Sequence, residues 1–143
     1  MPEVKDTTDQ FVAAFNAHDE RALAALHSDD IKFNAPGGFK ATNAKDATAY
    51  AMTWLKAFPD GKMKVRTEIV SGPWVVQEIQ MEGTHTAPLD APTGTIPPTY
   101  KKVTGYGVQI LRVEDGKIGE ARIYFDQLEQ LSQLGLLPAP AKV

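Results

Sequence analysis

Asp126 is the first candidate for chemistry, because its carboxylate has a type and a position suited to proton transfer. It ends a segment of alternating residues and precedes a leucine-rich one, so we expect it at the opening of a pocket. A carboxylate beside an apolar cavity becomes more basic as water is removed, which suits a general base. The alternative is that Asp126 only caps the following helix, a favoured position for aspartate. The two roles are compatible.

His85 is the second candidate. An alternating segment with Val75, Ile79 and Met81 on one face leads up to it, and the period of two places the imidazole on that same face. An N–H group there can donate a hydrogen bond to an oxygen anion that forms during a reaction, and removing one such donor costs about 3 kcal/mol. The structural alternative is a histidine at a strand end that hydrogen-bonds to loop backbone. The sequence leaves both open.

Aromatic side chains are the candidates for binding the body of an apolar ligand. Trp54 forms a stripe with Tyr50 and Phe58 at helical spacing. Most such stripes belong to the core, and the alternative is that Trp54 lines a ligand cavity. Tyr106 stands between two glycines, where its phenol can reach a place at which the backbone passes close. Trp54 and Tyr106 are therefore our candidate substrate-binding residues.

Arg122 and Tyr124 complete the candidate substrate-binding set. They share a strand face with Glu120 and Asp126. If that face looks inward, Arg122 pairs with a carboxylate of the site; if it looks outward, these residues make surface or dimer contacts. The opposite face is the more apolar one, which slightly favours the outward interpretation. It carries Ala121, Ile123 and Phe125.

The residue counts exclude several other kinds of site. The chain has no Cys, which removes disulfides, thiolate nucleophiles and zinc fingers. Its histidines, His18, His27 and His85, include no pair at the spacing that places two ligands on one helix face. We therefore expect no metal site.

Composition bounds the class of protein and its partners. The chain has 143 residues, 43% of them hydrophobic, and no linker that would divide it, so we expect one domain over residues 1–143. With a net charge of −3, the chain lacks the excess of positive charge with which proteins bind nucleic acid or an anionic membrane. The N-terminus has no apolar signal core. We expect a soluble cytoplasmic protein with neither kind of partner.

Helical signals occupy the first third of the chain. Thr7 and Gln10 form a capping-box pair, which predicts a helix that begins near Thr7. Asp19 is an N-cap residue for a second, short helix. Asn43 begins a third helix, and residues 58–61 end it.

From Lys62 onward the apolar period becomes two, which predicts strands. In the first of them Glu68 falls on the solvent face with Lys64 and Arg66. The strands expected are 31–35, one that starts at Lys62, 74–83, 101–113 and 117–126, with a hairpin turn over 114–116 and a short closing helix rich in leucine. The proline-rich stretch Thr86 to Thr99 is expected to be a lid or rim over the site. Helices first and strands afterwards predict an α+β fold with a curved, mostly antiparallel sheet.

Six segments occur in a familiar order along nearly the whole chain. They are Phe15 to Asp19, Phe58 to Asp60, Gly83 to Thr86, Ile96 to Thr99, Val113 to Ile118, and Phe125-Asp126 followed by Gln133 to Gly135. Together they resemble the SnoaL-like polyketide cyclases, or ester cyclases, of the NTF2-like superfamily. The resemblance implies an NTF2-like cone, in which the sheet wraps around the N-terminal helices and an apolar pocket lies between them.

The resemblance also implies a function. SnoaL-like cyclases close a ring by intramolecular aldol condensation without metal or organic cofactor, and are often homodimers. For this chain it implies an apolar or polyketide-like substrate, with Asp126 and His85 as catalytic residues. The chain departs from the family pattern at Glu120-Ala121-Arg122, where many relatives have Glu-His-Trp. The alternatives are a non-catalytic binder of an apolar small molecule and an NTF2-like protein-interaction module.

Overall fold

The computed structural model describes residues 2–91 and 94–137. From Lys62 onward the described chain is mostly strand, as the change of period predicts, and before Lys62 three helices are interspersed with two strands. The helices are α1 (Pro2–Asn16), α2 (Glu20–Leu26), α3 (Ala44–Ala57) and α4 (Gln127–Gln133). The strands are β1 (His27–Ala35), β2 (Phe39–Ala41), β3 (Lys62–Ser71), β4 (Trp74–Thr84), β5 (Leu89–Ala91), β6 (Gly94–Ile96), β7 (Lys102–Glu114) and β8 (Lys117–Phe125). No helix in the described part of the chain is long and apolar enough to cross a membrane.

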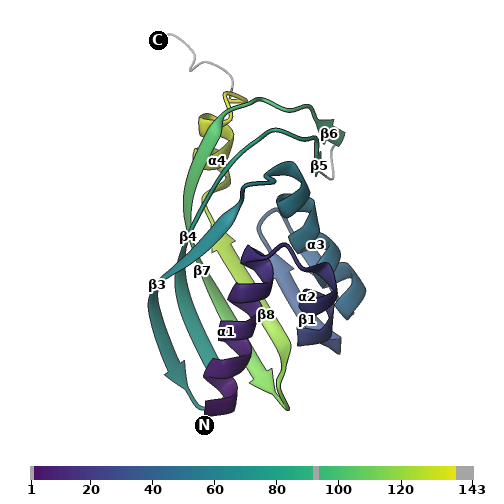
Figure 1. Cartoon of the computed structure of the whole chain (residues 1–143), viewed down its shortest axis with the longest axis vertical. Coiled ribbons are helices and arrows are strands. Elements are labelled where there is room, and N and C mark those ends of the chain that lie inside the picture. The colour runs from purple at the N-terminus through teal and green to yellow at the C-terminus, as the bar shows by residue number, and fades with distance from the viewer. Residues whose placement is uncertain (1, 92–93, 138–143) are drawn as a thin grey trace.

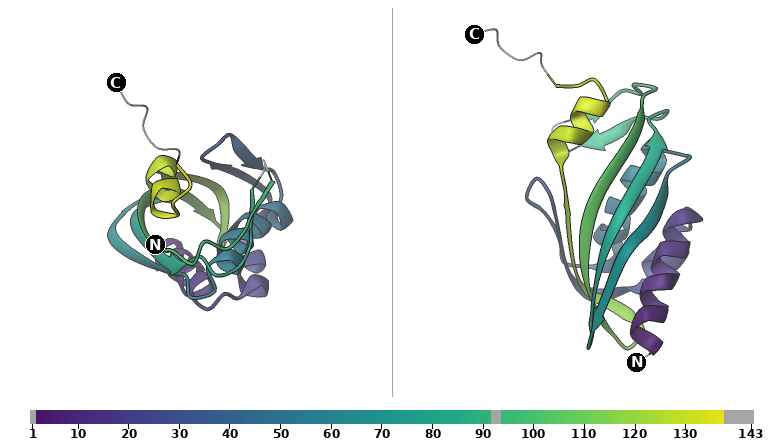
Figure 2. Two further views of the ribbon diagram at one scale, coloured as in Figure 1. Left: turned by 90° about the horizontal axis from the view of Figure 1, so that it is seen from above. Right: turned by 90° about the vertical axis from the view of Figure 1, so that its left-hand side faces the viewer.

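The main sheet has six strands in the order β2-β1-β8-β7-β4-β3. Its pairs are antiparallel except β1 with β8, which run parallel. Figures 1 and 2 show the sheet curving around α1, α2 and α3, while α4 lies across one end of it. The expected α+β cone, with a curved and mostly antiparallel sheet around the N-terminal helices, is confirmed.

The core fills the space between the three helices and the concave face of the sheet. Alternation along β4, β7 and β8 turns one set of side chains inward, and those residues are buried. Among the side chains with less than 2% exposure are Leu23, Ile31, Ile79, Leu111 and Ile118.

Two of the three predicted helix starts are confirmed. Asp19 caps α2 by accepting a hydrogen bond from the Ala22 N–H, and Asn43 caps α3 by accepting from the Asp46 N–H. The prediction that the first helix begins near Thr7 was wrong, since α1 already begins at Pro2. Proline is tolerated in a first turn, because its missing N–H would be unpaired there in any case.

The predicted faces of β3 hold only for its first half. Met63 is buried, but the register with β4 shifts between Val65 and Thr67. This irregularity reverses the alternation, because one extra residue moves every later side chain to the other face. Glu68 therefore turns toward Gln77 on the covered face, and Ile69 is 59% exposed.

The proline-rich stretch Thr86 to Thr99 differs from the expected lid. It contains the hairpin of β5 and β6, and its Leu89 is buried against the end of α3, where it packs with Phe58 and Val103. None of its described residues lines the main cavity. The lid prediction was wrong because Leu89 supplies an apolar anchor that fixes the segment to the core.

Candidate functional site

A cavity lies between α3 and the inner face of the sheet, with α4 at one end. It is lined mainly by aromatic and aliphatic side chains, with a few charged and amide groups. The lining residues are Phe15, Tyr50, Ala51, Trp54, Leu55, Phe58, Gly61, Lys62, Met81, Glu82, Gly83, Val103, Gly105, Tyr106, Ile123, Phe125, Asp126, Glu129, Gln130 and Gln133.

Glycines on the inner face of the sheet make room for the cavity. At Gly105 nothing lies within 4 Å of where a Cβ would stand, so the space there is open. At Gly83 a Cβ would lie 3.0 Å from the Cβ of Phe58, so glycine lets the end of α3 sit close to β4. Gly105 therefore leaves open space on β7, whereas Gly83 allows close packing of β4 against the end of α3.

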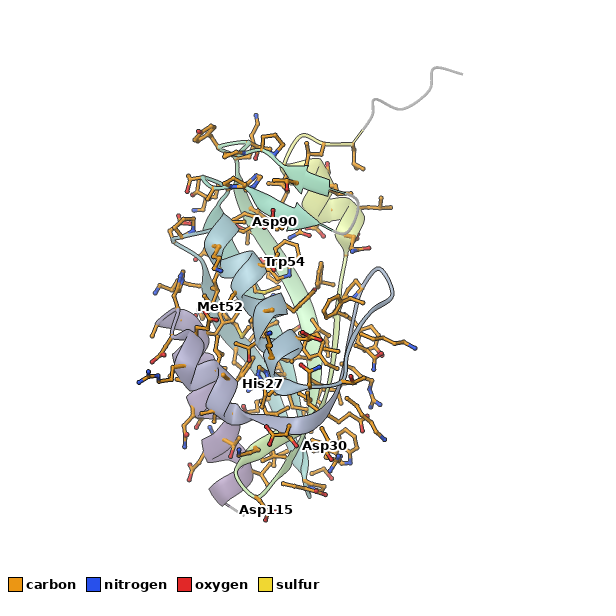
Figure 3. The ribbon with its side chains drawn as sticks, turned by 90° about the vertical axis from the view of Figure 1, so that its right-hand side faces the viewer. His27, Asp30, Met52, Trp54, Asp90 and Asp115 are labelled. Carbon is orange, nitrogen blue, oxygen red and sulfur yellow. The ribbon has the colours of Figure 1, made fainter. Side chains whose placement is uncertain are left out.

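The apolar wall is built around Trp54, which is half-buried on α3 (Figure 3). Its ring stacks on Phe58 with the ring centroids 6.2 Å apart, and meets Phe125 edge to face at 5.9 Å. Edge-to-face and offset aromatic pairs at this separation are favourable. Trp54 is a lining residue, which is the alternative that the sequence left open beside a position in the core.

The polar end of the cavity carries the charged side chains, all of them exposed. Carboxylates come from Glu82, Asp126 and Glu129, and one ammonium group from Lys62. The Lys62 Nζ donates to the backbone oxygen of Asn16 at 2.6 Å. The charged groups thus stand where the cavity meets solvent and the aromatic groups stand deeper.

Asp126 combines the two positions that the sequence proposed for it. Its Oδ1 accepts a hydrogen bond from the Glu129 N–H at 3.0 Å, which makes it the N-cap of α4. It is also a lining residue of the cavity. Within residues 2–91 and 94–137 no hydrogen bond is made to Oδ2. One oxygen therefore holds the helix while the other is available at the rim.

His85 is buried behind the cavity wall. Its ring packs on Phe58 with centroids 5.3 Å apart, and its Nδ1 accepts from the Thr99 N–H at 3.2 Å. Burial lowers its pKa. The predicted inward direction of the side chain is met, but Phe58 lies on the cavity side and His85 is not a lining residue. This geometry is that of the structural alternative, a histidine bonded to loop backbone.

Tyr106 lines the cavity from its edge and is 46% exposed. The guanidinium carbon of Arg66 lies 5.0 Å from the centroid of its ring, within range of a cation–π contact. Tyr106 thus lies at the site, as the sequence suggested, and its side chain is also partly exposed to solvent.

Arg122 and Tyr124 lie on the outer face of the sheet, so the outward alternative is the one observed. Arg122 donates to Glu120 at 2.8 Å and stands over the ring of Trp74 at 5.5 Å. Tyr124 is 57% exposed and borders a separate hollow with Asn34. Neither Arg122 nor Tyr124 lines the main cavity. The reason is that the apolar face of β8 turns to the core.

The sequence analysis did not single out several polar residues of this region. Gln130 and Gln133 reach the cavity from α4, about one and two helical turns beyond Asp126. Gln133 accepts from the Thr104 N–H at 2.7 Å and donates to the Thr104 oxygen at 2.9 Å, which fixes α4 to β7. The alternation along β7 could have identified Gln109 as inward-facing. It is 1% exposed on the same face as Leu111.

Metal binding finds no support in the described residues. Nowhere in residues 2–91 and 94–137 are three His, Asp or Glu side chains grouped so that they could hold a metal ion. What the arrangement can do is bind an apolar body against Trp54 and Phe58 and present a carboxylate at its edge.

The sequence is similar to those of known proteins. Residues 5–134 match the model of the SnoaL-like polyketide cyclase family. The aklanonic acid methyl ester cyclase DnrD of Streptomyces peucetius is 34% identical over 92 residues, which are 63% of this chain and 61% of that protein. The matched region therefore spans less than two thirds of that relative.

Solved structures agree over almost the full length. AclR of Streptomyces galilaeus superposes with a TM-score of 0.81 at 27% identity, covering 99% of this chain and 87% of AclR. A SnoaL-like protein of Jannaschia sp. CCS1 shares the fold, with a TM-score of 0.83 at 18% identity over 96% of this chain and 94% of its own. Since the family model covers nine tenths of the sequence and the cone holds its apolar cavity, the chain belongs to the SnoaL-like polyketide cyclase family.

Proposed function

We propose that this protein is a cofactor-independent enzyme that enolises an apolar, polyketide-like ketone in the cavity and closes a ring from the enolate. The observation that carries the proposal is the carboxylate of Asp126 at the rim of a mainly apolar cavity, where its Oδ1 caps α4 and its Oδ2 accepts no hydrogen bond from the described residues. Membership of the cyclase family and the similarity to an aklanonic acid methyl ester cyclase support it.

The reaction needs one base and one donor. Asp126 removes a proton from a carbon next to a carbonyl group, and the enolate carbon then bonds to a second carbonyl carbon of the same molecule. The oxygen of that second carbonyl takes up the proton, so the ring closes without a leaving group. Gln130 and Lys62 also line the cavity and can donate to the developing oxygen anion.

Asp126 is preferred over the other carboxylates for a geometric reason. The residues of β8 on the inner face are Ala121, Ile123 and Phe125, none of which ionises, so a base must come from the rim. Asp126 directly follows Phe125 and its Oδ1 is fixed by the helix cap, which orients Oδ2. An oriented group is already positioned for proton transfer.

The test is deuterium exchange into 2-tetralone, whose C1 methylene lies between a carbonyl and an aromatic ring. Exchange is followed by NMR in D₂O. We expect Asp126→Asn to lower the enzyme-catalysed rate by roughly 10²-fold or more, since it removes the base and keeps an oxygen for the cap. Asp126→Ala should lower the rate as much and also cost about 1 kcal/mol of unfolding free energy.

Glu129→Gln is the matched control, since Glu129 is a second exposed carboxylate in the same wall. It should keep the exchange rate within a few-fold. An unchanged rate in Asp126→Asn would remove this residue from the mechanism.

Non-catalytic binding of an apolar small molecule is the second candidate function. The absence of ionisable groups among the inner-face residues of β8 favours it. Saturable binding of 2-tetralone with no exchange above the buffer rate would establish this function instead.

A further inference from the structure

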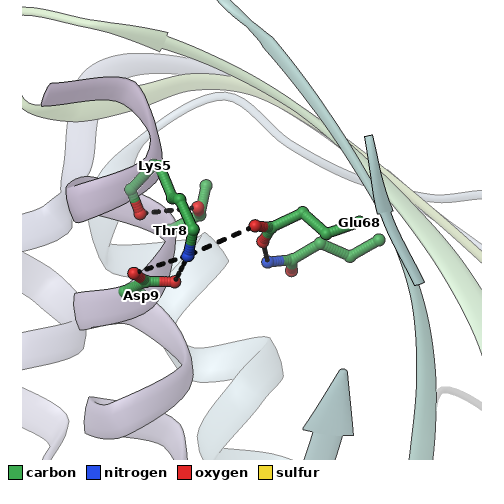
Figure 4. A network of polar contacts seen from close by, with 5 residues as sticks. Lys5, Thr8, Asp9 and Glu68 are labelled. Carbon is green, nitrogen blue, oxygen red and sulfur yellow. Dashed lines mark hydrogen bonds and ion pairs between the residues drawn. The ribbon is translucent and has the colours of Figure 1, made fainter. Parts of the chain in front are cut away.

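A chain of polar side chains crosses the core between α1 and the sheet. Gln109 donates from Nε2 to Oε1 of Gln77 at 2.7 Å, and Gln77 donates from Nε2 to Oε2 of Glu68 at 2.7 Å. Lys5 on α1 lies 3.4 Å from Oε1 of Glu68 and also binds Asp9 (Figure 4). The two glutamines are buried, with exposures of 0% and 1%.

The carboxylate of Glu68 fixes the donor-to-acceptor direction of the hydrogen bonds in this row of polar side chains. A carboxylate accepts hydrogen bonds and cannot donate, so Gln77 must turn its NH₂ group toward Glu68. Its Oε1 then faces Gln109, which must present NH₂ in turn. The group left at the inner end is therefore an acceptor, the Oε1 of Gln109. In the described residues this atom is buried without a hydrogen-bond partner.

The unpaired oxygen belongs to a residue next to the cavity. Gln109 pairs with Ile123 in the β7–β8 ladder, and Ile123 lines the cavity. Directly opposite residues on one face of a sheet are near neighbours. The Nε2 of Gln109 lies 3.9 Å from the sulfur of Met63, a flexible side chain that can move aside for a ligand.

We propose that Gln109 Oε1 accepts a hydrogen bond from the ligand, which identifies the ligand as an apolar ring system with a hydroxyl or N–H group at its buried end. A buried acceptor without a partner discriminates strongly in favour of a molecule that supplies the missing donor. This inference rests on the proposed binding cavity and deepens it. It requires no catalysis.

The test compares two probes of one shape. 2-Naphthol can donate a hydrogen bond, whereas 2-methoxynaphthalene cannot, and their binding is measured by fluorescence titration. We expect the protein to bind 2-naphthol about tenfold more tightly, and Gln109→Met to abolish that preference. Gln80→Met is the matched control, since Gln80 is half-buried and neighbours Ile79 on the opposite face of β4; it should keep the preference.

A double variant distinguishes a lost binding preference from a failure to fold. Gln109→Met leaves Gln77 without its inner partner, so Gln77→Met with Gln109→Met replaces both groups by apolar ones and should also lose the preference. Equal affinities of the two probes for the wild-type protein, no binding of either, or a preference that survives in Gln109→Met would overturn the proposal. Loss of exchange activity in Asp126→Asn is a separate result, because that assay reports turnover and this one reports binding.

Discussion

At the scale of the residue, His85 and His27 are both buried. His85 packs behind Phe58, and His27 is 3% exposed with its Nδ1 2.9 Å from the Thr48 hydroxyl. Figure 3 shows His27 near the lower end of α3. Burial lowers the pKa of His27 to about 4. The hydrogen-bond donor that the sequence analysis sought in His85 must then come from a residue that lines the cavity, and Gln130 and Lys62 are the ones that we propose.

The buried His27 predicts a loss of stability in mild acid. The unfolded chain protonates this residue near pH 6.5, whereas the folded protein keeps it neutral down to about pH 4. The unfolded state therefore binds more protons in that window. The free energy of unfolding should fall as the pH drops from 6.5 to 4, by about 3 kcal/mol from this residue, and be fully present above pH 6.5.

Urea titrations at a series of pH values measure this effect. In His27→Asn most of the decline should disappear, leaving the part due to His85, whose pKa burial also lowers. A decline of the same size in His27→Asn would show that other groups cause it.

At the scale of the element, α4 is attached to the sheet at two points and completes one end of the cavity. Gln133 binds both backbone groups of Thr104, and Leu134 is 2% exposed in a cluster with Phe58 and Leu89. The other contacts of the helix are weaker, and Leu128 is 66% exposed. The position of Asp126 at the rim therefore depends on Leu134.

Replacing the buried Leu134 should destabilise the protein more than replacing the exposed Leu128. Leu134→Ala should lower the free energy of unfolding by about 2–3 kcal/mol and weaken binding of 2-naphthol, because it empties a buried site. Leu128→Ala is the control and should change stability by less than about 0.5 kcal/mol. Chemical denaturation of both variants makes the comparison. Similar small losses in both would mean that α4 is held by Gln133 alone.

At the scale of the whole molecule, the outer face of the sheet carries apolar side chains that are only partly buried. Val76 and Ile110 pair across the β4–β7 ladder and are only half-buried, and Trp74 lies under Arg122. Apolar groups flanked by charges of both signs suit a self-complementary contact between two copies. We propose a homodimer through this face.

Analytical ultracentrifugation tests the dimer at tens of micromolar protein. The wild type should sediment as a dimer and Ile110→Glu as a monomer, because the change places a charge at the centre of the contact. Val70→Glu, at an exposed site near the end of β3, should remain dimeric. A monomeric wild type would contradict the proposal.

The sequence by itself determined the features that depend on neighbouring residues. The change of period at Lys62, the caps Asp19 and Asn43 and the turn at Gly116, whose φ is +71°, all appear as expected. Each of these signals acts within a few residues, so it can be interpreted without knowing the rest of the fold. The resemblance of ordered motifs identified the family.

The tertiary structure decided what meets across the core. Alternation assigns side chains to one face of a strand, yet it cannot show an irregularity such as the one that turns Glu68 inward. Nor can it show that Phe58 separates His85 from the cavity, or that the Oε1 of Gln109 is left without a partner. These outcomes depend on how α3 and the sheet pack, and contacts between residues far apart in sequence have no local signal.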